Sequence, residues 1–398
     1  MGKWILIPDS FKGTMSSREV CTMMASALRH HLPEAEIVSV PVADGGEGSV
    51  EAFLTALGGR RVEVPCTGPD GRPITGFYGC LPDGTAVIEM AAAAGLPLME
   101  GHLCPERATT YGVGELLRAA VRDGARRVIL GLGGSATNGG GAGMLQALGA
   151  RVVDDQDCDV APGLAGLEHV SSIDLTSALR ALSGARIVVL SDVENPLVGR
   201  RGALAVFGGQ KGLPTDDAEA LRRYDSWMVG YGRLLDAAIT GVRAQGLLRV
   251  PEGARTFGSV LGVPGAGAAG GLGAALLALG AELRSGVETV LDLVGFDERV
   301  RDVDLVITGE GNMDEQSAAG KAPVGVARRA KRYGKPVIAV VGGRADNLDA
   351  VYGQGIDLVL PICRKPMGLE QALDPQEATT NLICAGESAA QAYDLARL

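Results

Sequence analysis

The chain has 398 residues, of which 46% are hydrophobic and 4% aromatic, and its formal net charge is −10. This acidity, with no basic run, argues against a nucleic-acid-binding protein, and the high apolar content excludes a disordered chain. The length exceeds what one hydrophobic core usually serves, so we expect two domains. The 59 glycines and few aromatics favour parallel α/β layers joined by tight turns.

The compartment is predicted from the cysteines and the apolar segments. Seven cysteines are scattered without a C-x-x-C pair, which is typical of free thiols in a cytoplasmic protein. The apolar run at residues 4–7 is too short for a signal peptide. Residues 259–281 carry no charge, but their glycines and Pro264 favour a phosphate-type loop before a buried helix over a membrane span. We therefore expect a cytoplasmic protein with no membrane partner.

Apolar runs and turn signals predict the secondary structure in chain order. Ser16 or Ser17 is expected to cap the first helix, with Glu19 in its first turn. Further helices are expected at 114–123, 144–148, 216–244 and 272–279. Strands are expected at 4–7, 36–42, 61–64, 76–79, 85–89, 128–130, 185–190, 304–307, 337–341 and 356–360.

This order of elements predicts an α/β protein of two α/β domains. The first two and last three strands are alike, so residues 1–67 and 292–398 are expected to form one discontinuous, Rossmann-like domain with a parallel sheet. Residues 68–291 would then form an inserted α/β domain with glycine-rich loops. Turn signals within residues 60–89 indicate an antiparallel patch at the crossing into the inserted domain.

The stretch at 128–143, VILGLGGSATNGGGAG, predicts a strand, a glycine loop and a helix. Backbone N–H groups at such a junction bind anions, most often phosphate. A tight turn that only packs the helix on the sheet is the plainer interpretation. Gly131-x-Gly133-x-x-Ala136 also fits a dinucleotide-binding pattern, but residues 137–141 lengthen the loop beyond that fingerprint.

Carboxylates and lysines follow several predicted strands. The sets are Asp9 with Lys12, Asp44 with Glu47, Asp192 with Lys211, and Glu310 with Asp314 and Lys321. Such groups suit phosphoryl transfer, because magnesium needs carboxylates, lysines offset phosphate charge, and a carboxylate can orient the attacking hydroxyl. With four histidines in the chain, no Ser/His/Asp or Cys/His apparatus can be assembled.

At these loops the sequence resembles the bacterial glycerate kinase family of the kind that makes 2-phosphoglycerate. The matching stretches, in family order, are Pro8–Gly13, Ala43–Gly48, Val64–Gly68, Ala108–Gly112, Gly133–Gly143, Asp192–Gly199 with Phe207–Gly212, Pro264–Gly273, and Ile307–Gly311 with Gly320–Gly325. The resemblance implies ATP- and magnesium-dependent phosphorylation of D-glycerate on its 2-hydroxyl. It also implies an active site in the cleft between two α/β domains.

The resemblance and the loop chemistry together suggest roles. Asp44 and Asp192 are expected to orient or deprotonate the substrate hydroxyl, and Glu310 and Asp314 to hold magnesium. The catalytic set is completed by Lys12 and Lys211. Candidate substrate- and phosphate-binding residues are Asp9, Ser10, Glu47, Gly133, Gly134, Ser135, Asn138, Asn195, Gln210, Gly267, Gly270, Thr308, Gly309 and Lys321.

Four positions depart from the family pattern. Gly139 stands where the family usually has Asp and Asn312 where it usually has Arg, with lesser departures at Ser191 and Gly209. They leave open a weakened or non-catalytic relative. The sequence is also compatible with a kinase for the 3-hydroxyl or a related hydroxy acid, and less well with an NAD-dependent dehydrogenase. The expected partners are D-glycerate and ATP, and the sequence leaves a homodimer open.

Overall fold

The computed structural model describes residues 2–11, 13–42, 45–99, 101–182, 184–248 and 258–395, without the side chains of residues 316 and 319. Contacts divide the chain into two compact units. Unit 1 comprises Met1–Asp44, Glu51–Gly58 and Gly286–Leu398, and unit 2 comprises Gly45–Val50 and Gly59–Ser285.

Unit 1 is built on a five-stranded sheet in the order β13-β12-β11-β1-β2, and every pairing in it is parallel. Its strands are β1 (Lys3–Leu6), β2 (Glu36–Ser39), β11 (Leu305–Met313), β12 (Val337–Arg344) and β13 (Leu358–Pro361). The central strands are buried on both faces, as helices covering a parallel sheet require. The carboxyl ends of β1, β11 and β12 therefore meet at one edge of this sheet.

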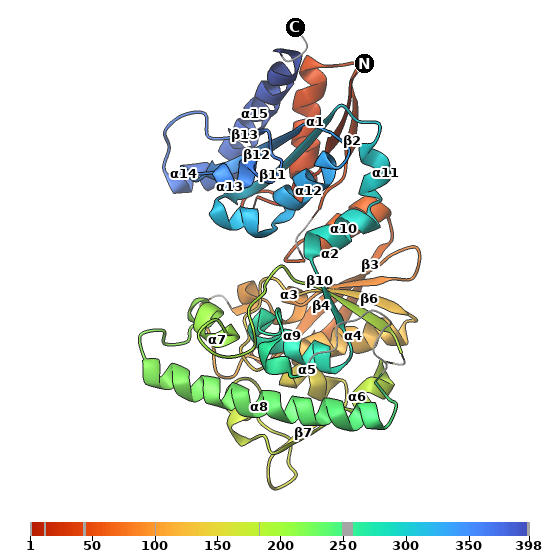
Figure 1. The fold of residues 1–398 in the computed structure, drawn as a ribbon, viewed down its shortest axis with the longest axis vertical. Helices are drawn as coiled ribbons and strands as arrows, with labels where there is room; N and C mark the ends of the chain where they lie inside the picture. The colour runs from red at the N-terminus through yellow and green to blue at the C-terminus, as the bar shows by residue number, and fades with distance from the viewer. Residues whose placement is uncertain are drawn as a thin grey trace. The chain divides into compact units, whose positions relative to one another are not determined.

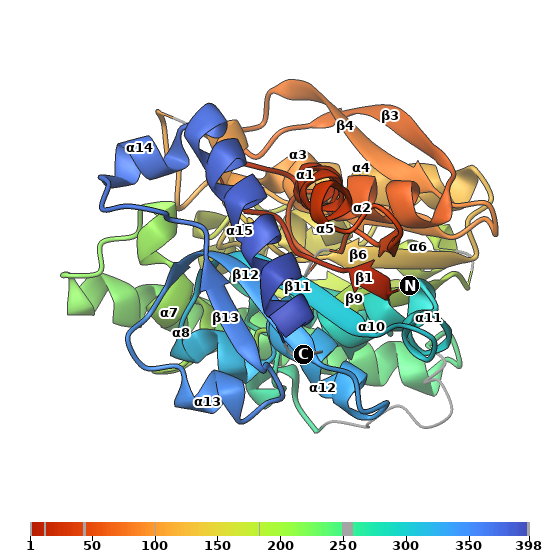
Figure 2. The same cartoon turned by 90° about the horizontal axis from the view of Figure 1, so that it is seen from above.

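Helices cover both faces of this sheet, with α1 and α15 side by side on one face and α12 on the other (Figure 2). The helices of unit 1 are α1 (Ser17–His31), α2 (Ser49–Leu57, whose first two residues belong to unit 2), α10 (Gly286–Leu293), α11 (Phe296–Val300), α12 (Ala322–Lys331), α13 (Asp349–Tyr352), α14 (Leu369–Leu373) and α15 (Pro375–Leu395). Side chains of α1, α15 and the strands between them form one hydrophobic core.

Helix α1 has a cap at its N-terminus and a buried apolar stripe, and both follow from its sequence. Ser16 accepts a hydrogen bond from the backbone N–H of Glu19, and the Glu19 carboxylate accepts one from the backbone N–H of Ser16. This capping box satisfies two N–H groups that have no partner within the helix. Val20, Met24 and Leu28 form the buried stripe at helical spacing. The predicted cap at Ser16 is confirmed.

Unit 2 is built on a mixed six-stranded sheet in the order β10-β9-β6-β5-β4-β3. The four strands from β10 to β5 are parallel, whereas β4 pairs antiparallel with both β5 and β3. The strands are β3 (Arg60–Thr67), β4 (Pro73–Cys80), β5 (Ala86–Glu89), β6 (Arg127–Gly131), β9 (Arg186–Leu190) and β10 (Glu282–Arg284), with a separate pair of β7 (Arg151–Val153) and β8 (Ser172–Asp174).

The helices of unit 2 include α8, the longest helix among the described residues, which packs against α9 (Figure 1). They are α3 (Ala91–Ala94), α4 (Tyr111–Arg122), α5 (Ala142–Ala147), α6 (Thr176–Ala181), α7 (Ala203–Phe207), α8 (Ala218–Ala244) and α9 (Ala268–Ala278). Their buried side chains join the sheet in one hydrophobic core.

The structure confirms the predicted mixed α/β fold class and refines two predicted boundaries. The first domain was expected to run to Thr67, but β3 pairs along its whole length with β4, which places residues 59–67 in unit 2. Residues 308–311 were expected as a loop, but they continue β11, because their pairing with β12 persists to Met313. All seven cysteines are free. Of the described helices, none has both the length and the apolar composition that crossing a bilayer needs.

Candidate active site

Unit 1 contains a cavity of about 650 Å³, called cavity A here, at the carboxyl-end edge of its sheet. Ligands collect at this edge in open parallel sheets. Cavity A is lined by Asp9, Ser10, Phe11, Thr14, Glu310, Gly311, Asn312, Lys321, Gly342, Gly343, Ile362, Cys363, Met367, Leu369, Ala372, Leu373 and Ala378. Residues at the ends of β1 and β11 and at the start of α12 thus supply its charged side chains, and β12 contributes two glycines.

The predicted set of Glu310, Asp314 and Lys321 is brought together beside cavity A. Lys321 Nζ lies 3.4 Å from Glu310 Oε2 and 3.8 Å from Asp314 Oδ1. Asp314 caps the short helical turn that follows β11, where its carboxylate accepts a hydrogen bond from the backbone N–H of Ser317. Burial raises the pKa of the Glu310 carboxyl, and the Ser317 hydroxyl and the Lys321 ammonium oppose this shift. One flexible lysine thus faces two carboxylates at the end of β11.

This donor set fits a magnesium ion. Glu310 Oε1 is buried and has no hydrogen-bond partner among the described residues, so one lone-pair site is left for a cation. Magnesium takes oxygen ligands and is usually held by one or two carboxylates together with phosphate oxygens. Glu310 and Asp314 are the residues that would hold it, and Lys321 could then turn toward a phosphate.

Other candidates near cavity A have structural contacts. Asp9 is buried and lines the cavity, and its carboxylate accepts a hydrogen bond from the backbone N–H of Ser10 at 2.7 Å. Thr308 is fully buried and its hydroxyl donates to the Ile7 carbonyl, which joins β11 to β1. At Gly309 a Cβ atom would lie 2.2 Å from the carbonyl oxygen of a β12 residue. Thr308 and Gly309 therefore build the sheet rather than the cavity wall.

Unit 2 contains a smaller cavity of about 260 Å³, called cavity B here, beside the glycine-rich loop. It is lined by Leu96, Leu132, Gly133, Gly134, Ser135, Val193, Phe207, Gln210, Lys211 and Ala269. Five of the predicted residues are therefore in its wall. Asn138 is fully buried beyond the wall, and its Oδ1 has no hydrogen-bond partner within the described parts of the chain, although its Nδ2 donates to Pro105 O.

Lys211 is the cation of cavity B. It is 2% exposed, and its Nζ donates hydrogen bonds to Thr137 O at 2.7 Å and Ser135 Oγ at 3.4 Å. Burial lowers the pKa of Lys211 to about 7, because no carboxylate of the described residues offsets the loss of hydration. A lysine in this state gains a proton readily when an anion enters the cavity.

Glycines of this loop and of the first turn of α9 allow backbones to pack closely. A Cβ atom on Gly133 would lie 2.5 Å from Gly46 Cα, and one on Gly270 would lie 1.9 Å from Thr137 O. Gly270 also has φ near +66°, which disfavours any side chain. Close packing thus accounts for several of these glycines, as in the plainer interpretation, while Gly134 and Ser135 face the cavity.

Gly139, where the family usually has Asp, packs against a second glycine. A Cβ atom there would lie 2.7 Å from the Gly163 carbonyl carbon and 2.9 Å from Gly163 Cα. An aspartate would require one of the two loops to move. The other departure, Asn312, lines cavity A and donates a hydrogen bond to Asp314 Oδ2 at 3.3 Å.

Several predicted residues lie outside both cavity walls. Asp192 was paired with Lys211 in the sequence, but it is exposed and accepts a hydrogen bond from Ser285 Oγ at 2.9 Å, while Lys211 bonds to the glycine loop. Asn195 holds the loop before α9, because its carbonyl oxygen accepts from Gly267 N at 3.0 Å. Glu47 is exposed. Lys12 and Asp44 lie outside the described residues.

Glu89 was not predicted as a site residue. It is 3% exposed at the carboxyl end of β5, and its Oε1 accepts a hydrogen bond from the backbone N–H of Val50 at 2.6 Å. Burial raises the pKa of Glu89, and backbone N–H groups of Val50 and Gly48 oppose this shift. Glu89 thus fixes the loop that carries Glu47. No sequence signal separates it from an ordinary strand residue.

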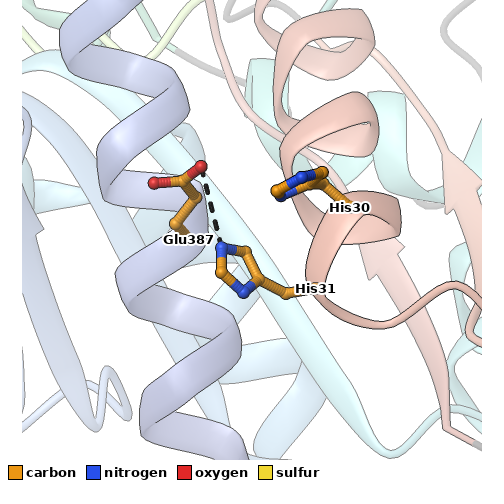
Figure 3. A group of neighbouring side chains, drawn as sticks. All are labelled: His30, His31 and Glu387. Carbon is orange, nitrogen blue, oxygen red and sulfur yellow. Dashed lines mark ion pairs between the residues drawn. The ribbon is translucent and has the colours of Figure 1, made fainter.

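A group of possible metal ligands lines neither cavity. His30 and His31, in the last turn of α1, approach Glu387 on α15 (Figure 3). Their ligand atoms lie within 4.8 Å of one another, and His31 Nε2 is 3.6 Å from Glu387 Oε1. Both histidines are exposed. We assign this group no part in either cavity.

Two α/β units, one with a carboxylate–lysine cavity and one with a lysine set among glycines, define an enzyme of the kinase class. A family model described as "Glycerate kinase family" matches residues 4–394. The chain is 42% identical to a glycerate kinase of Bacillus subtilis (strain 168) over 94% of this chain and 93% of that one. It is 42% identical to a glycerate 2-kinase of Escherichia coli (strain K12) over 93% of each chain.

A solved structure agrees with this result. The crystal structure of a protein assigned as glycerate kinase 2, from Salmonella typhimurium LT2, has a TM-score of 0.82 and 41% sequence identity, and the match covers 100% of this chain and 99% of that one. The chain belongs to the glycerate kinase family.

Proposed function

We propose that this protein transfers the γ-phosphoryl group of ATP to the 2-hydroxyl of D-glycerate, giving 2-phospho-D-glycerate and ADP. Family membership supports the substrate, and the name of the Escherichia coli relative supports the 2-hydroxyl. The observation that carries the proposal is the Glu310–Asp314–Lys321 set, in which two carboxylates and a lysine meet at the wall of a large cavity.

The reaction needs a base for the hydroxyl proton, groups that offset the negative charge of the phosphates, and a bound acceptor. The 2-hydroxyl oxygen would attack the γ-phosphorus as the bond from that phosphorus to the ADP oxygen breaks, and the hydroxyl proton would pass to Asp44 or Asp192. Magnesium, when bound, would offset the charge of the phosphate oxygens. Glu310 and Asp314 would hold the ion, and Lys321 would bind a phosphate oxygen.

The acceptor is assigned to unit 2. D-Glycerate is a small anion, and cavity B is small and contains the buried cation Lys211. Lys211 Nζ and the polar groups of Ser135 and Gly134 would bind its carboxylate. Burial makes each such hydrogen bond stronger than it would be in water.

The test is ADP release by the purified protein with D-glycerate, ATP and magnesium, with the product coupled to enolase. ADP release with an immediate enolase signal is the expected result, because enolase consumes 2-phosphoglycerate. ADP release without that signal would indicate the 3-hydroxyl or another hydroxy acid. Folded protein that binds D-glycerate but releases no ADP would indicate a non-catalytic relative, which the residues Gly139 and Asn312 leave open.

A further inference from the structure

Cavity A has two sides of different chemistry. The side at the ends of β1 and β11 carries Asp9 and Glu310, with Lys321 at the start of α12. The side that follows β13 is apolar, with Ile362 and residues of α14. Two strand spacings, or about 10 Å, separate β11 from β13 in the sheet, because β12 lies between them. A ligand that fills cavity A must therefore be long, charged at one end and apolar at the other.

The apolar side contains exposed leucines. Leu369 is 76% exposed and Leu373 is 43% exposed, and both line the cavity. Large apolar side chains left in water at a cavity wall mark a surface that a ligand covers. Glycerate is a three-carbon acid with hydroxyl groups and has no apolar face to place there. A nucleobase, by contrast, is a flat ring with two apolar faces.

The segment that carries this wall is anchored within unit 1. Arg364 Nε donates to Asn381 Oδ1 at 2.6 Å, and its Nη2 donates to Glu377 Oε1 at 3.0 Å. Both acceptors lie on α15, which packs on the sheet. The wall is therefore held in place without a ligand, which lowers the entropic cost of binding.

We propose that cavity A is the nucleotide site of this kinase, with the base against Leu369 and Leu373 and the phosphates toward Lys321. The inference rests on the proposed function and adds to it where ATP binds. The volume of cavity A, about 650 Å³, lies in the range of small-molecule sites, whereas cavity B has about 260 Å³. The larger substrate, ATP, is therefore assigned to the larger of these two cavities.

The test is calorimetric titration of the full chain with ADP and magnesium. The variants are Leu369→Ala, Leu373→Ala and the double variant. The control is Leu395→Ala, a leucine of the same unit that is 69% exposed and lines neither cavity. Each substitution of a cavity leucine is expected to raise the Kd for ADP about fivefold, because it removes apolar contact with the base. The control substitution is expected to leave this Kd unchanged, and none of the variants is expected to change KM for D-glycerate.

The possible outcomes test the location of the nucleotide separately from the proposed function. Because both leucines are exposed, their truncation should leave the thermal unfolding of the protein unchanged, and the double variant should also lose binding of adenosine alone. Wild-type affinity for ADP in the double variant would overturn the location and leave the proposed function standing. No ADP binding by the wild-type protein would overturn both.

Discussion

The ammonium group of Lys211 is expected to make the stability of the protein depend on pH. Its pKa is lowered from 10.5 to about 7 in the folded protein, whereas the unfolded chain keeps the proton up to about 10.5. Between these values the unfolded state binds more protons, so the free energy of unfolding should rise with pH, by up to about 1.4 kcal/mol per pH unit from this group. Denaturant unfolding at pH 7 and pH 9 measures this slope. Lys211→Met should lack it, and equal slopes in both proteins would contradict the burial argument.

Asp192 is suited to a test that separates turnover from folding. The side chain is exposed and accepts a hydrogen bond from Ser285, which asparagine can also accept through its Oδ1. Asp192→Asn should therefore change the free energy of unfolding by less than about 0.5 kcal/mol while lowering kcat by about a hundredfold or more. Asp44→Asn should lower kcat similarly, and Asp216→Asn, at an exposed position in neither cavity wall, is the control. Near-normal turnover in both Asp44 and Asp192 variants would remove these two from the role of base.

At the scale of residues, the sequence predicted what lies close along the chain. Glu310, Asp314 and Lys321 are near in sequence after one strand, and the structure brings them together. Lys211 was paired with Asp192 in the sequence, but its hydrogen-bond partners come from the glycine loop seventy-odd positions earlier. Glu89 was missed for the same reason, since its partner lies on another segment of the chain. A contact between residues far apart in the chain leaves no pattern in the sequence around either residue.

Among the elements, a glycine in the non-helical first turn of α9 and one in the regular helix α8 should respond oppositely to alanine. Gly270 has a positive φ, and a Cβ there would collide with Thr137 O, so Gly270→Ala should destabilise the protein by about 3 kcal/mol or more. Gly241 lies on an exposed face of α8 with no described atom near its would-be Cβ, and Gly241→Ala should stabilise by about 0.5–1 kcal/mol. Thermal and denaturant unfolding measure both. A neutral Gly270→Ala would show that the first turn of α9 can rearrange.

The strands were predictable from the sequence where a buried strand appears as a run of apolar residues. The ten predicted strands correspond to β1, β2, β3, β4, β5, β6, β9, β11, β12 and β13. The three-residue strands β7, β8 and β10 were not predicted, because so short a pairing needs no distinctive pattern. Strand β11 ran further than expected, since its neighbour β12 continues to supply hydrogen bonds through a glycine-rich sequence.

For the whole molecule, the proposals divide the substrates between the units, ATP with cavity A of unit 1 and D-glycerate with cavity B of unit 2. This division predicts a kinetic split between two lysines of the same charge. Lys321→Met should raise KM for ATP about tenfold and leave KM for D-glycerate near its wild-type value, whereas Lys211→Met should do the reverse. Both should lower kcat, because each removes a charge close to a reacting molecule. Lys335→Met, in unit 1 but in neither cavity wall, is the control. Steady-state kinetics with each substrate varied in turn measures the split. If both variants raised KM for ATP, the assignment of cavity B to D-glycerate would fail, and if both raised KM for D-glycerate, the assignment of cavity A to ATP would fail.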